Sequence, residues 1–230
     1  MNERSVCALS PQAGAAPSPA ENLLGEWRAL LQQIGAPDTS TESSASLWPI
    51  DLNAFSSLHD FLENYLNQLL FKLELPAIVE ACGYARRGAW RELLAQDLRW
   101  PDMGQPKPFA DASRRIGRLQ LARLAPLRDE RTAQRYLAAV QSGQAHGWHT
   151  MVYGLTLAVY SLPLRQGLLH YAQETLSALA IAAGRAGNVA EAELAEILSP
   201  LLAQIPQAVA LALQGEDLVS QVSTDAGTAG

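Results

Sequence analysis

The residues best placed by type and spacing to do chemistry are two histidines, His146 and His149, which flank the pair Gly147 and Trp148. On a helix, a three-residue step turns both imidazoles toward one side, where they could ligate a single metal ion. The alternative is a helix start at which one histidine caps and the other packs. Because no third ligand is nearby in the sequence, we expect the second arrangement and predict no metal site.

A second group with chemical potential is a concentration of arginines between Lys107 and Arg135, opposed only by Asp111, Asp129 and Glu130. One interpretation is a docking surface for an acidic protein partner. The other is a solvated helix face with local ion pairs, which contribute little to stability. The sequence leaves both open. The arginines are Arg114, Arg115, Arg118, Arg123, Arg128, Arg131 and Arg135.

None of the familiar catalytic motifs occurs in the chain. We find no GxxxxGK[ST] phosphate loop, no GxGxxG after a strand, no GxSxG elbow, no HExxH helix and no pair of CxxC motifs. His59 and His170 are isolated, and Cys82 falls on the apolar side of its segment, so each is expected to pack rather than react. We therefore predict a protein that is not an enzyme, with no catalytic residues and no cofactor.

Composition limits the partners that the chain can have. Its 230 residues are 48% hydrophobic and 17% charged, with a formal net charge of −6 and a pI near 5.2. A net negative field argues against general affinity for nucleic acid or for anionic membranes. The apolar stretches are interrupted by polar residues or proline before the ~20 residues that a membrane-spanning helix needs. With Cys7 and Cys82 as the only cysteines, we expect a soluble cytoplasmic protein.

The elements that must position these residues all follow the helical period. Apolar residues recur at three- and four-residue steps through most of the chain, and no strand alternation with hairpin signals occurs. The pattern predicts an all-α, single-domain bundle of about ten helices over residues 21–213, with a polar loop near 38–46. Residues 1–20 and 214–230 are predicted to be a disordered N-terminal tail and a flexible C-terminal tail.

Three local expectations follow from the same pattern. Pro76 suits the first turn of a new helix, and Gly88 suits its end. The prolines and glycine of residues 100–108 predict an irregular loop. Residues 149–160 and 164–185 are apolar on nearly all sides, with small residues that permit close helix contact, so they are expected to be the buried centre.

Three stretches in order resemble the urease accessory protein F family. They are "SSLHDFLENYLNQLLFKLELPAIVEACGYARRGAW" from Ser56, "ASRRIGRLQLARL" with Ser113 and Gly117 four apart, and "HTMVYGLTLAVYSLPLRQGLLHYAQETLSALAIAAGR" from His149. Two departures accompany the likeness. Residues 38–50 read "DTSTESSASLWPI" where the family usually has a proline–glycine–phenylalanine–serine stretch. At the end of the third stretch, residues 185–191 read "RAGNVAE", whereas the family usually continues after the arginine with leucine and proline.

The resemblance implies an all-helical scaffold for nickel insertion into urease that dimerises and catalyses nothing itself. The implied partners are a second accessory protein (the D/H type), bound through the C-terminal part, a nickel-carrying GTPase, and the urease apoprotein. Together with the concentration of arginines described above, it gives a set of candidate partner-binding residues. These are Arg185, His149, Tyr153, Arg114, Arg115 and Arg118.

Arg185 is the position most expected on the partner surface, because a guanidinium fork can fix loop carbonyls or acidic groups in one geometry. Its alternative role is that of a helix-terminal arginine that binds its own last carbonyls. Two other functions stay open as well. One is a helical interaction module of the same descent that serves another metalloenzyme or a regulator, and the other is a small helical enzyme or ligand-binding domain with His146, His149 and His170 in a pocket.

Overall fold

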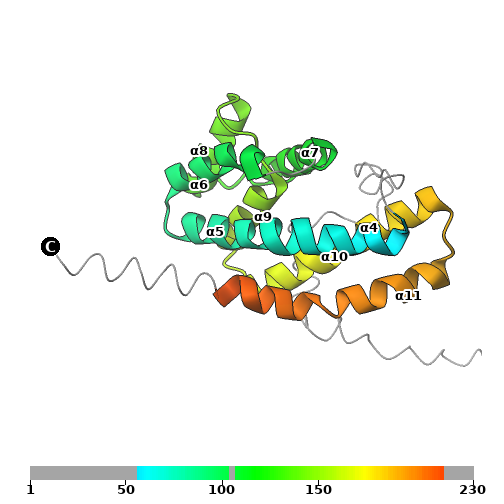
Figure 1. Cartoon of the computed structure of the whole chain (residues 1–230). Helices are drawn as coiled ribbons and strands as arrows, with labels where there is room; N and C mark the ends of the chain where they lie inside the picture. Colours follow the sequence, from blue (N-terminus) through cyan, green and yellow to red (C-terminus); the bar gives the residue numbers. More distant parts are fainter. Residues whose placement is uncertain (1–55, 104–106, 215–230) are drawn as a thin grey trace, which may run out of the picture.

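The computed structural model describes residues 56–103 and 107–214 (Figure 1). These residues are helical with short connections and contain no strand, so the predicted all-α class is confirmed. The tail expected at 1–20, the polar loop near 38–46 and the tail beyond Gln214 lie outside the described residues. The expected total of about ten helices therefore stays a prediction.

One long rod begins the described chain. Helix α4 (Leu58–Asn64) runs directly into the π-helical segment η2 (Tyr65–Glu74) and then into helix α5 (Leu75–Arg86). Ser57 caps the start, since its Oγ accepts a hydrogen bond from the backbone N–H of Asp60 at 3.1 Å. Figure 1 shows the rod crossing the middle of the molecule.

The rod continues through Pro76, which is a departure from the predicted start of a separate helix. Pro76 does lie in the first turn of α5, but no turn of irregular chain precedes it. The widened segment η2 lies directly before the proline, and its last bond runs from the N–H of Leu75 to the carbonyl of Leu70, five residues back. Because a proline removes one helical donor, a local change of hydrogen-bond step accommodates it without breaking the helix.

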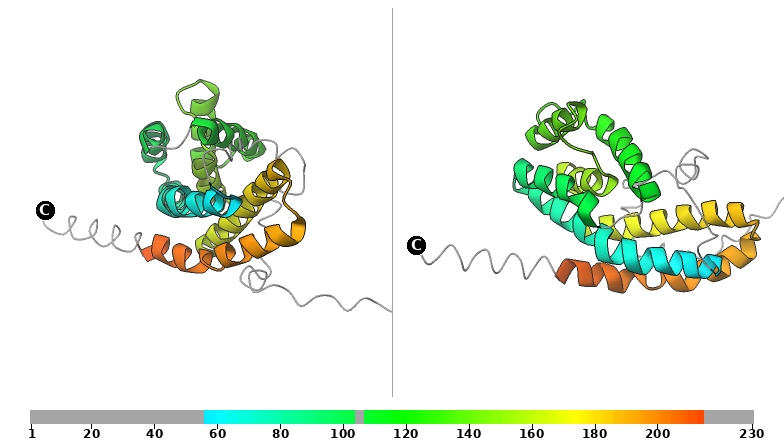
Figure 2. Two further views of the ribbon diagram at one scale, coloured as in Figure 1. Left: turned by 45° about the vertical axis from the view of Figure 1, so that its right-hand side comes forward. Right: turned by 45° about the horizontal axis from the view of Figure 1, so that its top comes forward.

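Helices α6 (Trp90–Arg99), α7 (Lys107–Arg123) and α8 (Arg131–Gln141) gather on one side of the rod (Figures 1 and 2). Gly88, with φ +68°, turns the chain between α5 and α6 as predicted. The loop expected over residues 100–108 is shorter than predicted. Trp100–Met103 form a 3₁₀ turn (η3), and α7 already begins at Lys107, because a proline is tolerated in the first turn of a helix.

Helices α9 (His149–Val159) and α10 (Leu164–Gly187) form the buried centre, as predicted. Nine consecutive residues of α9, from His149 to Leu157, are buried. The glycine in this run lets α9 approach α5 closely, because a Cβ at Gly154 would lie 2.7 Å from the carbonyl oxygen of Ile78. Asn188 ends α10 in the left-handed conformation, with φ 52°.

The chain returns along the other side of the rod in α11 (Glu191–Leu202) and a last helix over 205–214 (Figure 2). Among the described residues, Glu191–Gln214 is the one stretch whose length and composition would allow a membrane crossing, with a hydropathy of 1.4. A turn at residues 203–204 divides it, and Leu201, Ile205 and Val209 are buried in the core. Only 22% of the apolar window is buried in the described structure, so most of this stretch faces away from the core.

Candidate partner-binding surface on helix α7

Helix α7 has one buried stripe and one exposed stripe. Ala112, Ile116 and Leu121 are buried, and a second row occurs at steps of three and four residues on the outer side. We call this row the α7 face, and its members line a shallow hollow. It consists of Asp111, Arg114, Arg115, Arg118 and Leu119. The structure therefore brings together three of the predicted partner-binding residues.

The buried stripe of α7 touches the start of α9 almost backbone to backbone. A Cβ at Gly117 would lie 2.1 Å from the carbonyl oxygen of Gly147 and 2.7 Å from the amide nitrogen of His149. One helical turn earlier, the Oγ of Ser113 accepts a hydrogen bond from that same amide at 3.2 Å. The four-residue spacing of Ser113 and Gly117 thus has a physical cause, which is that only small residues allow this approach.

A buried carboxylate fixes the turn that α7 touches. The Asp97 carboxylate, at the end of α6, accepts hydrogen bonds from the backbone N–H groups of His146 (2.6 Å), Gly147 (3.0 Å) and Trp148 (3.4 Å). The hydroxyl of Tyr136 donates to it at 2.5 Å, and the indole N–H of Trp148 donates to the Asp97 carbonyl at 2.9 Å. A fully buried charge is tolerated where several donors surround it.

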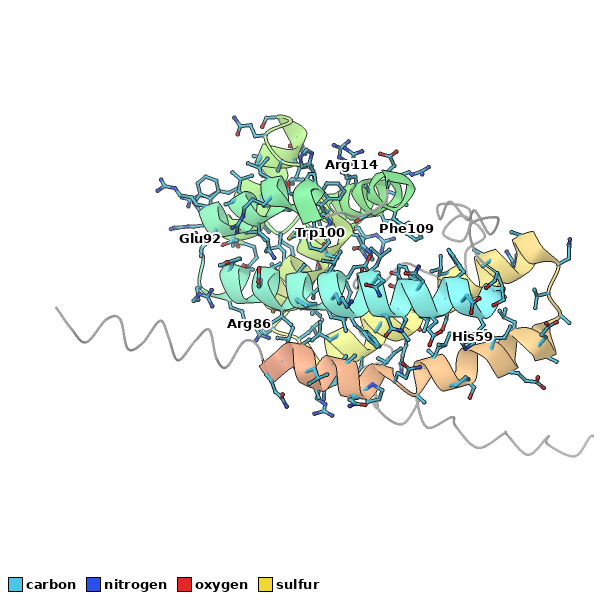
Figure 3. All side chains as sticks on the ribbon, in the orientation of Figure 1. His59, Arg86, Glu92, Trp100, Phe109 and Arg114 are labelled. Atoms are coloured by element: carbon cyan, nitrogen blue, oxygen red, sulfur yellow. The ribbon has the colours of Figure 1, made fainter. Side chains whose placement is uncertain are left out.

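The same turn orders two arginines of the α7 face. Arg118 donates from Nε to the carbonyl of His146 at 3.1 Å. The guanidinium of Arg114 lies 5.3 Å from the centre of the Trp148 ring and forms an ion pair with Asp111. Figure 3 shows Arg114 on the side of α7 that faces away from the rod. These contacts restrict both cationic side chains, and a side chain that is already restricted loses less entropy when it takes part in binding.

An apolar side chain stands among these cations. Leu119 is 61% exposed, and it is one of the few large hydrophobic residues at the surface of the described chain. Most protein interfaces combine an apolar centre with a polar rim. The α7 face thus holds both an exposed apolar residue and a basic row.

The two histidines that first suggested a metal site lie in different surroundings. His149 begins α9 and is buried, with its ring 5.1 Å from that of Tyr171 and 6.1 Å from that of Tyr153. His146 is half-buried and packs against Trp148, with ring centres 5.4 Å apart. The helix start predicted for this segment is present, with His149 as its packed member, but the predicted capping histidine is not found, because the N-cap residue is Trp148 and His146 packs against its ring.

The other predicted site residues are placed elsewhere. Tyr153 is buried, and its hydroxyl donates to the carbonyl of Gly167 at 3.0 Å, so Tyr153 and His149 lie beneath the surface rather than on it. Arg185 is exposed in the last turn of α10, where the chain turns toward α11. The structure therefore does not join Arg185 to the α7 face.

Sequence reasoning missed a second buried carboxylate in η2. Glu74 lies in the core, where Oε2 accepts hydrogen bonds from the hydroxyls of Tyr65 (2.8 Å) and Tyr171 (3.1 Å). Burial raises its pKa to about 7, although the two tyrosine hydrogen bonds act in the opposite direction. One acidic residue inside the apolar run "LLFKLELP" was the only available signal, and its partner on α10 is 97 residues away.

These observations define the class of protein first: a helical bundle with an ordered basic row on its outer surface. A comparison with family models then supplies the relationship. The UreF model matches residues 53–202, well over half of the chain, so the chain belongs to the UreF family. The predicted resemblance is confirmed. No curated protein matches the chain.

Family membership implies an accessory role in nickel insertion into urease, together with other urease accessory proteins. The matched residues begin near the start of the rod and end with α11. They include all of α7 and the turn that Asp97 holds. The α7 face therefore belongs to the family domain and is not an appendage of it.

Proposed function

We propose that this chain is a non-catalytic cytoplasmic scaffold for nickel insertion into urease, and that the α7 face binds an acidic surface of an accessory partner. The observation that carries the proposal is the pre-ordered pair Arg114 and Arg118, held by Trp148 and by the His146 carbonyl. The partners would be the nickel-carrying GTPase and the second accessory protein, and the scaffold would act as a homodimer.

Charge and geometry favour this surface over a merely solvated one. Arg115 and Arg118 form no ion pair with a described residue, so their charge is available to a partner. Leu119 supplies apolar area at the C-terminal end of the row. Charged rims steer association and set specificity, whereas the desolvated centre supplies most of the affinity.

The proposal is tested by co-expression of the full chain with urease and its accessory proteins. Charge reversal at Arg114→Glu, Arg115→Glu and Arg118→Glu is expected to abolish copurification of one accessory protein and to lower the nickel content of urease. A folded wild-type chain that captures neither accessory protein would overturn the scaffold role.

A matched control distinguishes an effect of the α7 face from an effect of the change in net charge. Arg128 and Arg131 are exposed arginines near the start of α8 and do not line the α7 face. The double variant Arg128→Glu and Arg131→Glu is expected to copurify with partners as the wild type does. Equal losses in both variants would mean that net charge, not the α7 face, governs assembly.

A further inference from the structure

A pocket of about 250 Å³ lies between the rod and the end of α6. Its inner wall is apolar, made by Leu73, Pro76 and Ala77 of the rod and by Trp100, which is 3% exposed. Figure 3 shows Trp100 between the rod and the layer that holds α6 and α7. The volume and the wall suit one apolar group of about the size of an amino-acid side chain.

A buried amide in the pocket lining has unused hydrogen-bonding capacity. Gln96 is 6% exposed, and its Nε2 donates to the Ala77 carbonyl (3.2 Å) and to Oε2 of Glu80 (2.9 Å). Its Oε1 is buried and has no hydrogen-bond partner among the described residues. Because buried polar atoms are almost always paired, this oxygen calls for a donor.

The pocket rim is cationic. Lys72 and Arg99 stand on opposite elements of the rim, and Glu80 is the one carboxylate in the lining. That carboxylate is already engaged by the Gln96 amide and by the charge of Arg99. The rim therefore retains net positive charge, which favours an anion beside the apolar pocket.

We propose that this pocket binds an apolar residue that carries a free carboxylate next to an amide N–H. The side chain fills the space against Trp100 and Pro76, and the carboxylate lies between Lys72 and Arg99. Oε1 of Gln96, which is enclosed in the free protein, turns toward the pocket and accepts a hydrogen bond from the N–H. An N-acylated apolar amino acid and the C-terminal residue of a polypeptide share this chemistry. This site is separate from the α7 face and does not depend on the proposed function.

The test is a nuclear magnetic resonance titration of the full ¹⁵N-labelled chain, which follows the Gln96 side-chain amide and the Trp100 indole N–H. The probes are N-acetyl-leucine and a hexapeptide of glycine and alanine that ends in leucine with a free carboxylate. Saturable shifts of both signals are expected. Tighter binding of the hexapeptide identifies a polypeptide C-terminus as the source, and tighter binding of N-acetyl-leucine identifies a small molecule.

Matched probes and variants test each contact. The hexapeptide amide, which lacks the carboxylate, and an N-methyl-leucine hexapeptide, which lacks the donor, should each bind about tenfold more weakly. The double variant Lys72→Met, Arg99→Met should bind the hexapeptide with the free carboxylate more weakly by about the same factor. Arg91→Met, on the same helix but outside the pocket lining, should leave the affinity unchanged. Equal binding of acid and amide, or no shift at Gln96 and Trp100, would overturn the proposal.

Discussion

Asp97 and Glu74 are both buried carboxylates, but their surroundings differ in kind. Asp97 accepts hydrogen bonds from three backbone amides and a tyrosine, all on the α8–α9 side of the molecule. Among the described residues, Glu74 accepts hydrogen bonds from two phenol hydroxyls inside an apolar core. The first arrangement compensates a charge and uses it to fix a turn. The second leaves the charge poorly compensated, and this raises the pKa of Glu74 to about 7.

The largest expected effect on stability comes from removing the Asp97 carboxylate. Asp97→Ala leaves three backbone N–H groups and the Tyr136 hydroxyl without their acceptor, so we expect a loss of roughly 3–5 kcal/mol in the free energy of unfolding. Urea denaturation followed by circular dichroism measures this loss. A loss below about 1 kcal/mol would show that water replaces the carboxylate and that the turn does not depend on Asp97.

The second prediction uses the pH dependence of Glu74. Because its pKa is raised from 4.5 to about 7 on folding, the folded state binds more protons than the unfolded state between these values. Stability should therefore fall as the pH rises from 4.5 to 7, and ionised Glu74 should cost about 3 kcal/mol above that range.

The variant Glu74→Gln should remove this slope, because it cannot ionise. It is expected to be more stable than the wild type by about 1–3 kcal/mol at pH 8 and to lose the advantage near pH 4.5. Denaturation curves at several pH values measure the difference. Parallel pH profiles for both proteins would contradict the assignment of the slope to Glu74.

The close contact between α7 and the turn that Asp97 holds gives a third prediction. Gly117→Ala adds a Cβ that would meet the Gly147 carbonyl and the His149 amide, so α7 must shift, at a cost of about 1–3 kcal/mol. Gly143→Ala is a useful contrast, since nothing lies within 4 Å of a Cβ there, although its positive φ brings strain of its own. Only the Gly117 variant should also weaken partner binding through the α7 face.

The helical period was sufficient to predict the class of fold, the buried centre at 149–185 and the exposed arginines of α7. The arginine pattern is local, because residues at steps of three and four share a helix face whatever the rest of the chain does. The family resemblance added the Ser113–Gly117 spacing, and the structure supplies its cause. Arg185, by contrast, was grouped with the α7 arginines only by that resemblance.

The carboxylate sites could not be predicted in the same way. Asp97 meets its partners across 39 to 51 residues, and Glu74 meets Tyr171 across 97. Such contacts depend on how helices pack, about which periodicity says nothing. The continuation of the rod through Pro76 was missed for a related reason, since proline usually marks a helix start and the π-helical segment has no sequence signal of its own.

The most direct test of the α7 face is the salt dependence of partner affinity, measured by calorimetry with the accessory protein that copurifies. The affinity of the wild type for the partner should fall as the salt concentration rises. The Arg114→Glu, Arg115→Glu, Arg118→Glu variant should bind the partner about 100-fold more weakly, and its affinity should depend much less on salt. The Arg128→Glu, Arg131→Glu variant should retain both. Unchanged affinity in the α7 variant would contradict the account.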